Sequence, residues 1–275
     1  MDPRPTFAPG LFDGSVALVT GGGTGIGRRT ALLLARLGAK VAIASRKQEN
    51  LDGTLGELAA IRGAANVFAR TCDIREPAEV ATLVAEIVGK LGGLDLLVNN
   101  AGGQFPSPAQ HIAPKGWEAV IRNNLNGTFY VTREVAEKVM IPAKRGRIVN
   151  VTANVHRGFP GMAHTGAARA GVENLTMTLA VEWSQFGITV NAVAPGVILS
   201  SGTVRYPPEI IERGRLGTPA RRLGAEEEVA DVIAFLLAPT TRYITGAIVP
   251  IDGGQRLWGE TWPLPDPGPE GLIPR

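Results

Sequence analysis

Short apolar runs alternate along this chain with segments of helical periodicity, and this alternation constrains the fold more than any other feature. The apolar runs predict strands at residues 16–20, 40–45, 66–72, 94–99, 147–152, 189–194 and 248–252. Between the third and fourth runs, apolar residues from Val80 to Leu91 fall on one face of a helix that Pro77 would open. Alternating strands and helices need crossover connections, so we expect an α/β fold with a doubly wound, mostly parallel seven-stranded sheet and helices on both faces.

The chain of 275 residues shows no interdomain linker and no internal repeat before its last stretch. Residues 258–275 differ, because proline occupies positions 263, 265, 267, 269 and 274. We therefore expect one domain over residues 1–257 and an extended, proline-rich tail over residues 258–275 with little structure of its own.

Charge and composition exclude several classes of protein. The 28 basic and 25 acidic residues are interspersed and give a net charge of only +3, so no nucleic-acid partner is expected. The single cysteine, Cys72, has no disulfide partner, and the three histidines lack ligand spacing, so no metal site is expected. No apolar run approaches the roughly 18 residues of a membrane span, and the first residues lack the apolar core of a signal peptide. We expect a cytoplasmic protein with no membrane partner.

A glycine-rich loop follows the first predicted strand. It reads Thr20-Gly21-Gly22-Gly23-Thr24-Gly25-Ile26-Gly27 and continues into a helical run. Glycines without β-carbons let the backbone and the helix N-terminus approach a pyrophosphate. A tight turn without a ligand is the alternative, but the strand before the loop and the helix after it favour a dinucleotide site.

The end of the second predicted strand bears on the choice of cofactor. An acidic residue there would bond the adenine ribose 2′-hydroxyl, but this chain has Ser45-Arg46-Lys47. A hydroxyl and two cations suit a 2′-phosphate, which favours NADP over NAD. Arg46 and Lys47 could also be plain solvated charges.

Further motifs make the sequence resemble the short-chain dehydrogenase/reductase family. They are Asp73-Ile74, Asn99-Asn100-Ala101-Gly102, Asn124-Leu125-Asn126-Gly127, Pro195-Gly196-Val197-Ile198 and Asp252-Gly253-Gly254. The resemblance implies a Rossmann-type sheet in the order 3-2-1-4-5-6-7 and a homodimer or homotetramer. It also implies that Asp73 faces the adenine, that Asn100 to Gly102 flank the cofactor and that Pro195 to Ile198 line the nicotinamide. The glycine loop, the end of the second predicted strand and the resemblance together imply a cofactor site made of Gly21, Gly23, Thr24, Gly25, Ile26, Gly27, Ser45, Arg46, Lys47, Asp73, Ile74, Asn100, Ala101, Gly102, Arg169, Pro195, Gly196 and Ile198.

The catalytic positions depart from that family. Its usual members carry a tyrosine with a lysine four residues later, and here alignment places Thr165 and Arg169 at these positions; the family's serine falls near Ala153. Reducing an isolated ketone creates an alkoxide, which needs a strong acid close by. A threonine hydroxyl is a far weaker acid than a tyrosine, and arginine does not release its proton. Efficient ketone chemistry by the usual route is therefore not expected.

A conjugated thioester avoids this difficulty. Hydride added to its β-carbon leaves an enolate, whose oxygen needs hydrogen-bond donors more than immediate protonation. Thr165 and Asn124 are candidate donors, and the segment from His164 to Gly171 is similar to that of peroxisomal trans-2-enoyl-CoA and 2,4-dienoyl-CoA reductases. The resemblance implies that Arg169 holds the nicotinamide ribose. We expect NADPH-dependent reduction of the 2,3 double bond of an acyl-CoA substrate, with Asn124, Thr165 and Arg169 as catalytic residues.

Other interpretations remain open at this point. A displaced acid such as Tyr206 would allow a carbonyl or 3-hydroxyacyl-thioester oxidoreductase, and a catalytically silent NADP-binding protein is a third possibility. Thr165 could simply cap its helix, and Arg169 could be a structural ion-pair partner. Asn124 could bind water or stabilise a helix kink.

Overall fold

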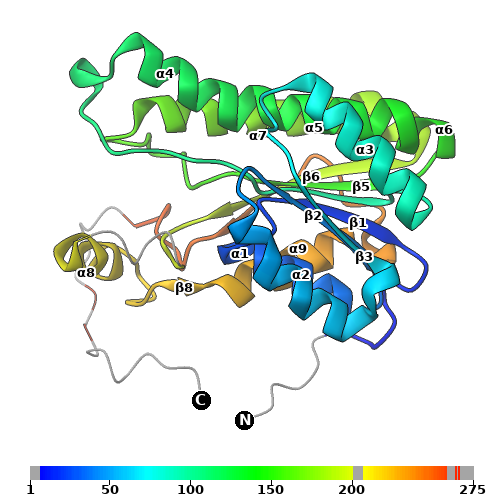
Figure 1. Ribbon diagram of the computed structural model, residues 1–275. Coiled ribbons are helices and arrows are strands. Elements are labelled where there is room, and N and C mark those ends of the chain that lie inside the picture. The colour runs from blue at the N-terminus through cyan, green and yellow to red at the C-terminus, as the bar shows by residue number, and fades with distance from the viewer. Residues whose placement is uncertain (1–6, 201–206, 259–263, 265, 267–275) are drawn as a thin grey trace.

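A seven-stranded parallel sheet in the order β3-β2-β1-β4-β5-β6-β9 forms the centre of the protein (Figure 1). The computed structural model describes residues 7–200, 207–258, 264 and 266. The strands of this sheet are β1 (Val16–Thr20), β2 (Lys40–Ser45), β3 (Val67–Thr71), β4 (Leu96–Asn99), β5 (Gly146–Val151), β6 (Ile188–Pro195) and β9 (Ile248–Ile251). The structure confirms both the doubly wound sheet predicted from the alternation and the strand order implied by the family resemblance.

The predicted strands agree closely with the observed ones. The runs at 16–20 and 40–45 coincide with β1 and β2, and the others differ by at most two residues at either end. A separate two-stranded pair, β7 (Ile198–Leu199) with β8 (Gly224–Ala225), was not predicted, because two residues are too few to show periodicity.

Helices cover both faces of the sheet (Figure 1). On one face lie α3, α4, α5 and α7, and on the other lie α1, α2 and α9, while α8 lies near β8 at one end of the molecule. Their bounds are α1 (Gly25–Arg36), α2 (Glu49–Arg62), α3 (Pro77–Leu91), α4 (Pro114–Ile121), α5 (Gly127–Val135), α6 (Ile141–Ala143), α7 (Ala163–Trp183), α8 (Pro208–Leu216) and α9 (Glu226–Leu237). Pro77 opens α3 as predicted.

The core consists of two apolar layers, one on each side of the sheet. Successive residues of a strand point to opposite faces, so Ala17 and Val19 of β1 belong to one layer and Val16 and Leu18 to the other. Burying one such valine or leucine contributes about 1.5–3 kcal/mol. None of the described helices is long and apolar enough to cross a membrane.

The strand order reverses direction between β1 and β4, which are neighbours in the sheet but follow different crossovers. In open α/β sheets, such a switch point leaves a crevice beyond the carboxyl ends of the strands, where ligands bind. The loops that follow β1, β2, β4, β5 and β6 all reach this edge, so the fold brings the predicted site segments together.

Candidate functional site

The glycine loop after β1 is built for a close approach of backbone to ligand. Gly21 and Gly25 have positive φ angles of 65° and 58°. A β-carbon on Gly27 would lie 2.3 Å from the carbonyl oxygen of Gly21, so only glycine lets the loop and α1 pack this tightly. Thr24, at the N-cap of α1, makes no side-chain cap and no acidic residue lies in the first turn. The first amides of α1 are therefore available to an anion.

A cavity of about 520 Å³, here called the β2 cavity, lies beyond the ends of β1, β2 and β4. Ser45, Arg46 and Lys47 line it, and its described lining contains no carboxylate. Lys47 also pairs with Glu49 at 3.1 Å on the surface. Asn100 donates through Nδ2 to the carbonyl oxygens of Thr20 and Gly21, at 3.1 and 3.2 Å, and so fixes the glycine loop while lining the cavity.

Asp73 does not line the β2 cavity. Its carboxylate binds the guanidinium of Arg75, which lowers the pKa of Asp73. The neighbouring residues Cys72 and Ile74 line the β2 cavity instead. Burial raises the pKa of the Cys72 thiol to about 12, so this cysteine stays a neutral, unreactive wall residue.

A second cavity, of about 830 Å³, is here called the β6 cavity and lies beyond the ends of β4, β5 and β6. It shares Asn100 and Gly102 with the β2 cavity. A dinucleotide can therefore extend from one cavity into the other, and the residues present fit a nicotinamide dinucleotide. Phe159, Pro160 and Met162 contribute apolar wall to the β6 cavity, as a substrate site requires.

Arg169, on α7, brings a buried positive charge to the β6 cavity. Its side chain is only 8% exposed, and its Nη1 donates to the carbonyl oxygen of Val151 at 2.7 Å. No carboxylate among the described residues pairs with it, so the structural ion pair considered from sequence is not formed there. Burial lowers the pKa of Arg169 to about 10, which leaves the group cationic at neutral pH. A β-carbon on Gly102 would lie 2.3 Å from Nη2 of Arg169, so this glycine makes room for the guanidinium.

Asn124 is fully buried in a π-helical turn, Arg122–Asn126, that joins α4 to α5. Its Nδ2 donates to the carbonyl oxygens of Gly103 and Val120, at 2.7 and 2.9 Å, and its Oδ1 accepts from the amide of Gly103 at 3.3 Å. The side chain thus ties the loop after β4 to the irregular turn, which agrees with the predicted kink. It is not among the residues that line either cavity.

Thr165 lies in the first turn of α7 and is fully buried. It is not the helix cap that the sequence allowed, because the N-cap is Met162. Its hydroxyl lies 3.1 Å from Nδ1 of His164, whose other ring nitrogen, Nε2, is buried without a partner among the described residues. Thr165 does not line the β6 cavity, whereas Arg169, one turn further along the same face of the helix, does.

Thr152, just beyond β5, does line the β6 cavity. Its hydroxyl lies 3.0 Å from the carbonyl oxygen of Val193 and 3.2 Å from Oε1 of Glu173. Burial raises the pKa of Glu173, and the hydrogen bond that Thr152 donates to its carboxylate opposes this rise. Tyr206, the displaced acid considered above, lies outside the described residues.

Most of the predicted cofactor residues lie on one of the two cavities. Those on the β2 cavity are Gly21, Thr24, Ser45, Arg46, Lys47, Ile74, Asn100, Ala101 and Gly102. Those on the β6 cavity are Ile26, Asn100, Gly102, Arg169, Pro195, Gly196 and Ile198. Gly23, Gly25, Gly27 and Asp73 line neither.

Sequence reasoning missed several lining residues, among them Asn50, Gln104, Arg157 and Trp258. Asn50 is near the start of α2, packed against the glycine loop, since a β-carbon on Gly23 would lie 2.0 Å from the carbonyl oxygen of Asn50. Trp258 was assigned to the tail, yet it belongs to the wall of the β6 cavity. Pattern alone gives no signal for such contacts.

Comparison with known proteins supports this description. A sequence-family profile described as Enoyl-(Acyl carrier protein) reductase matches residues 21–256. A probable 2,4-dienoyl-CoA reductase of Bacillus subtilis (strain 168) is 38% identical over 87% of this chain and 96% of the relative.

Solved structures are similar over nearly the whole chain. The citronellol catabolism dehydrogenase of Pseudomonas aeruginosa PAO1 is 47% identical, with a TM-score of 0.82, over 91% of this chain and 98% of that one. A variant of actinorhodin polyketide ketoreductase with NADPH is 33% identical, with a TM-score of 0.84, over 91% of this chain and 100% of that one. The glycine loop, the strand order and these similarities together show that the chain belongs to the short-chain dehydrogenase/reductase family of oxidoreductases.

Proposed function

We propose that this oxidoreductase uses NADPH to reduce the 2,3 double bond of an enoyl thioester, with an enoyl-CoA as substrate. The observation that carries the proposal is Arg169, a buried cation on the β6 cavity without a carboxylate partner among the described residues. The described lining of that cavity contains no tyrosine that could protonate an alkoxide. The relative named 2,4-dienoyl-CoA reductase supports hydride addition to a conjugated acyl-CoA, although its name gives a (2E)-enoyl-CoA as the product, so it supports the substrate class rather than the 2,3 position.

The resemblance assigns Arg169 to the nicotinamide ribose, and its positive charge also suits an enolate formed in the β6 cavity. When bound, NADPH supplies a hydride to the β-carbon of the substrate, which places negative charge on the thioester oxygen. A cation held in place before the reaction stabilises that charge without reorganising, and the α-carbon can then take its proton from water.

Asn124 and Thr165 have positioning roles in this proposal rather than direct contact with substrate. Both amide hydrogens of Asn124 are already donated to backbone carbonyls, so the residue holds Gly103 and the loop beside Arg169. Thr165 orients His164, because the Thr165 hydroxyl lies 3.1 Å from Nδ1 of that ring.

The assay for this function compares two substrates in one preparation. NADPH oxidation is expected with crotonyl-CoA or a longer enoyl-CoA, at a kcat/KM at least about a hundredfold above that for the matching 3-ketoacyl-CoA. The reverse order would favour a carbonyl reductase with a displaced acid. This is the second candidate function, because two similar proteins are named dehydrogenase and ketoreductase. Tight NADPH binding with no turnover would favour a silent binding protein.

We propose NADP rather than NAD as the cofactor because Arg46 and Lys47 line the β2 cavity. Changing both to alanine is expected to raise the Kd of NADPH about tenfold or more, since charge-assisted hydrogen bonds contribute about 1.5–3 kcal/mol each before solvent screening. The Kd of NADH should rise much less. Fluorescence titration with both cofactors measures this.

The control for that experiment removes two cations elsewhere. Arg133→Ala with Lys138→Ala changes the net charge equally, and both side chains are exposed partners of Glu137, away from the β2 cavity. Equal losses of NADPH and NADH affinity in the Arg46 and Lys47 variant would refute the 2′-phosphate assignment.

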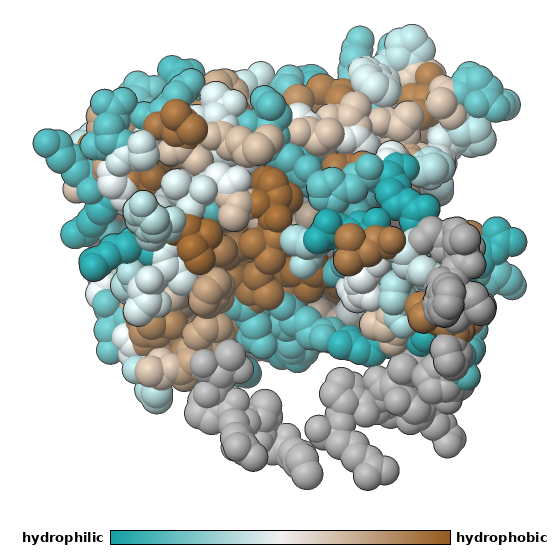
Figure 2. Space-filling view, turned by 180° about the vertical axis from the view of Figure 1, so that it is seen from behind, coloured by the Kyte–Doolittle hydropathy of each residue, from teal (hydrophilic) through white to brown (hydrophobic). Residues whose placement is uncertain are grey.

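We also propose that the protein acts in the cytoplasm as a homodimer or homotetramer. Large apolar side chains are exposed on its helices: Phe129 of α5 at 39%, Met177 and Val181 of α7 at 46% and 78%. Figure 2 views the molecule from behind and shows apolar side chains gathered in the middle of that face. Such surfaces suit association between copies of the chain.

A further inference from the structure

The chain beyond β9 returns to the mouth of the β6 cavity. Trp258 lines that cavity, and its carbonyl oxygen accepts a hydrogen bond from the guanidinium of Arg157 in the loop after β5. Arg213 of α8 and Gly217, the residue that ends α8, line the same cavity. Trp258 therefore lies between two walls of the mouth that come from distant parts of the sequence.

Arg221 contacts the chain beyond β9 at two residues, Trp258 and Leu264. It is only 9% exposed and has a positive φ of 56°, which is rare for a residue with a side chain. Its guanidinium donates to the carbonyl oxygens of Leu216 and, at 2.7 Å, Leu264, and it lies 4.8 Å from the centre of the Trp258 ring. Its Nε is buried with no partner among the described residues. A strained backbone and a buried cation persist only where the surroundings compensate, and here the compensation comes from the C-terminal residues.

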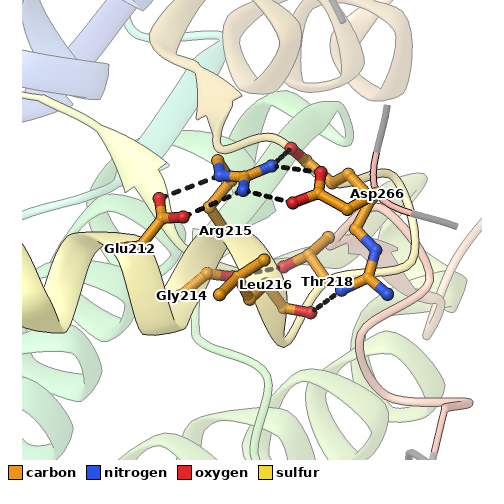
Figure 3. A network of polar contacts seen from close by, with 7 residues as sticks. Glu212, Gly214, Arg215, Leu216, Thr218 and Asp266 are labelled. Atoms are coloured by element: carbon orange, nitrogen blue, oxygen red, sulfur yellow. Dashed lines mark hydrogen bonds and ion pairs between the residues drawn. The ribbon is translucent and has the colours of Figure 1, made fainter. Parts of the chain in front are cut away.

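Asp266 makes the second attachment. Its carboxylate accepts two hydrogen bonds from Arg215 of α8, at 3.0 and 2.8 Å. Figure 3 shows Asp266 on one side of the Arg215 guanidinium and Glu212, from the same helix as Arg215, on the other. Both carboxylates raise the pKa of Arg215, whose side chain is 15% exposed. Such a paired, bidentate arrangement fixes geometry more firmly than an ordinary surface ion pair.

We propose that Trp258, Leu264 and Asp266 form a strap that holds α8 against the β6 cavity, and that Trp258 determines the size of the acyl group the cavity accepts. Trp258 is the specificity-determining residue, and Arg215, Arg221 and Asp266 are positioning residues. The choice of acyl groups as substrates rests on the proposed function, whereas the attachment of the strap to α8 does not.

The attachment is tested without any substrate. In the full-length protein with NADPH bound, Asp266→Asn keeps the size of the side chain but removes the negative charge and one of the two oxygens that accept from Arg215. Hydrogen exchange of the amides at residues 210–221 is expected to become about tenfold faster, because the helix loses its link to the strap.

Glu212→Gln is the matched control. It removes the other carboxylate from Arg215 but leaves the strap attached, so exchange at residues 210–221 should stay within about threefold of the unmodified protein. Equal acceleration in the two variants, or none in Asp266→Asn, would overturn the strap.

The specificity role is tested with Trp258→Ala and Trp258→Phe. Calorimetric Kd values for butyryl-CoA and dodecanoyl-CoA, measured with NADP⁺ present, need binding but no turnover. The Ala variant is expected to shift the ratio of the two Kd values at least about fivefold toward the longer chain, with the Phe variant between it and the unmodified protein. An unchanged ratio would overturn the role of Trp258. If neither acyl-CoA binds to any of the proteins, the acyl-size role and the proposed substrate class both fail, while the exchange experiment still decides the attachment.

Discussion

Replacing Arg169 with methionine is expected to lower kcat/KM for an enoyl thioester by about 10²- to 10³-fold, the usual cost of removing one donor from a developing oxyanion. The buried guanidinium faces the β6 cavity, and none of the described carboxylates neutralises it. Methionine fills similar space but brings neither charge nor donor. Initial rates of NADPH oxidation at saturating NADPH give the effect.

The methionine variant also leaves the carbonyl oxygen of Val151 without its donor, which costs about 1–3 kcal/mol of stability. Circular dichroism and thermal unfolding therefore accompany the kinetics. Arg169→Lys restores a positive charge, and we expect it to recover at least about a tenth of the lost activity. A methionine variant that keeps activity within a few-fold would reduce Arg169 to a structural residue.

The second large effect is expected at the glycine loop. Gly27→Ala should raise the Kd of NADPH by more than about a hundredfold, because displacing a binding loop by even 1 Å has effects of this size. The new β-carbon would meet the carbonyl oxygen of Gly21 at 2.3 Å and Nδ2 of Asn100 at 2.4 Å. Both atoms belong to the hydrogen bonds by which Asn100 fixes the loop, so neither can move freely.

Gly53→Ala provides the control for the same chemical change. Gly53 lies in α2 with nothing within 4 Å of its β-carbon position, so alanine there should stabilise the helix by up to about 1 kcal/mol. The Kd of NADPH should stay unchanged in this variant. If the Gly27→Ala protein is folded by circular dichroism and binds NADPH normally, the loop does not contact the pyrophosphate as described.

The sequence predicted the sheet well because the signals for a strand are local. The buried strands β1 and β2 are bounded by glycine and charged residues, so pattern alone locates their ends. The poor helix propensity of Asn124 predicted a polar role for its side chain. The structure places this residue in a π-helical turn, where the helix departs from regular geometry. These features depend on a few neighbouring residues, which a single sequence displays.

Other parts of the site depend on contacts between distant residues. The link from Arg215 to Asp266 crosses 51 positions, and no local pattern signals it. Composition set residues 258–275 apart from the domain, but it could not show that Trp258 and Asp266 contact the walls of the β6 cavity and α8. Similarly, the sequence placed Thr165 at the catalytic position, whereas the direction of its hydroxyl, toward His164, is set by packing.

The proposed function depends most on which carbon of the substrate receives the hydride, and deuterium transfer measures this directly. The protein is incubated with crotonyl-CoA and NADPH deuterated at the transferred position of C4, and the product is analysed by mass spectrometry and NMR. We predict butyryl-CoA with deuterium on C3 and solvent hydrogen on C2. No transfer to crotonyl-CoA, together with deuterium on C3 of 3-hydroxybutyryl-CoA formed from acetoacetyl-CoA, would contradict the account and identify a carbonyl reductase instead.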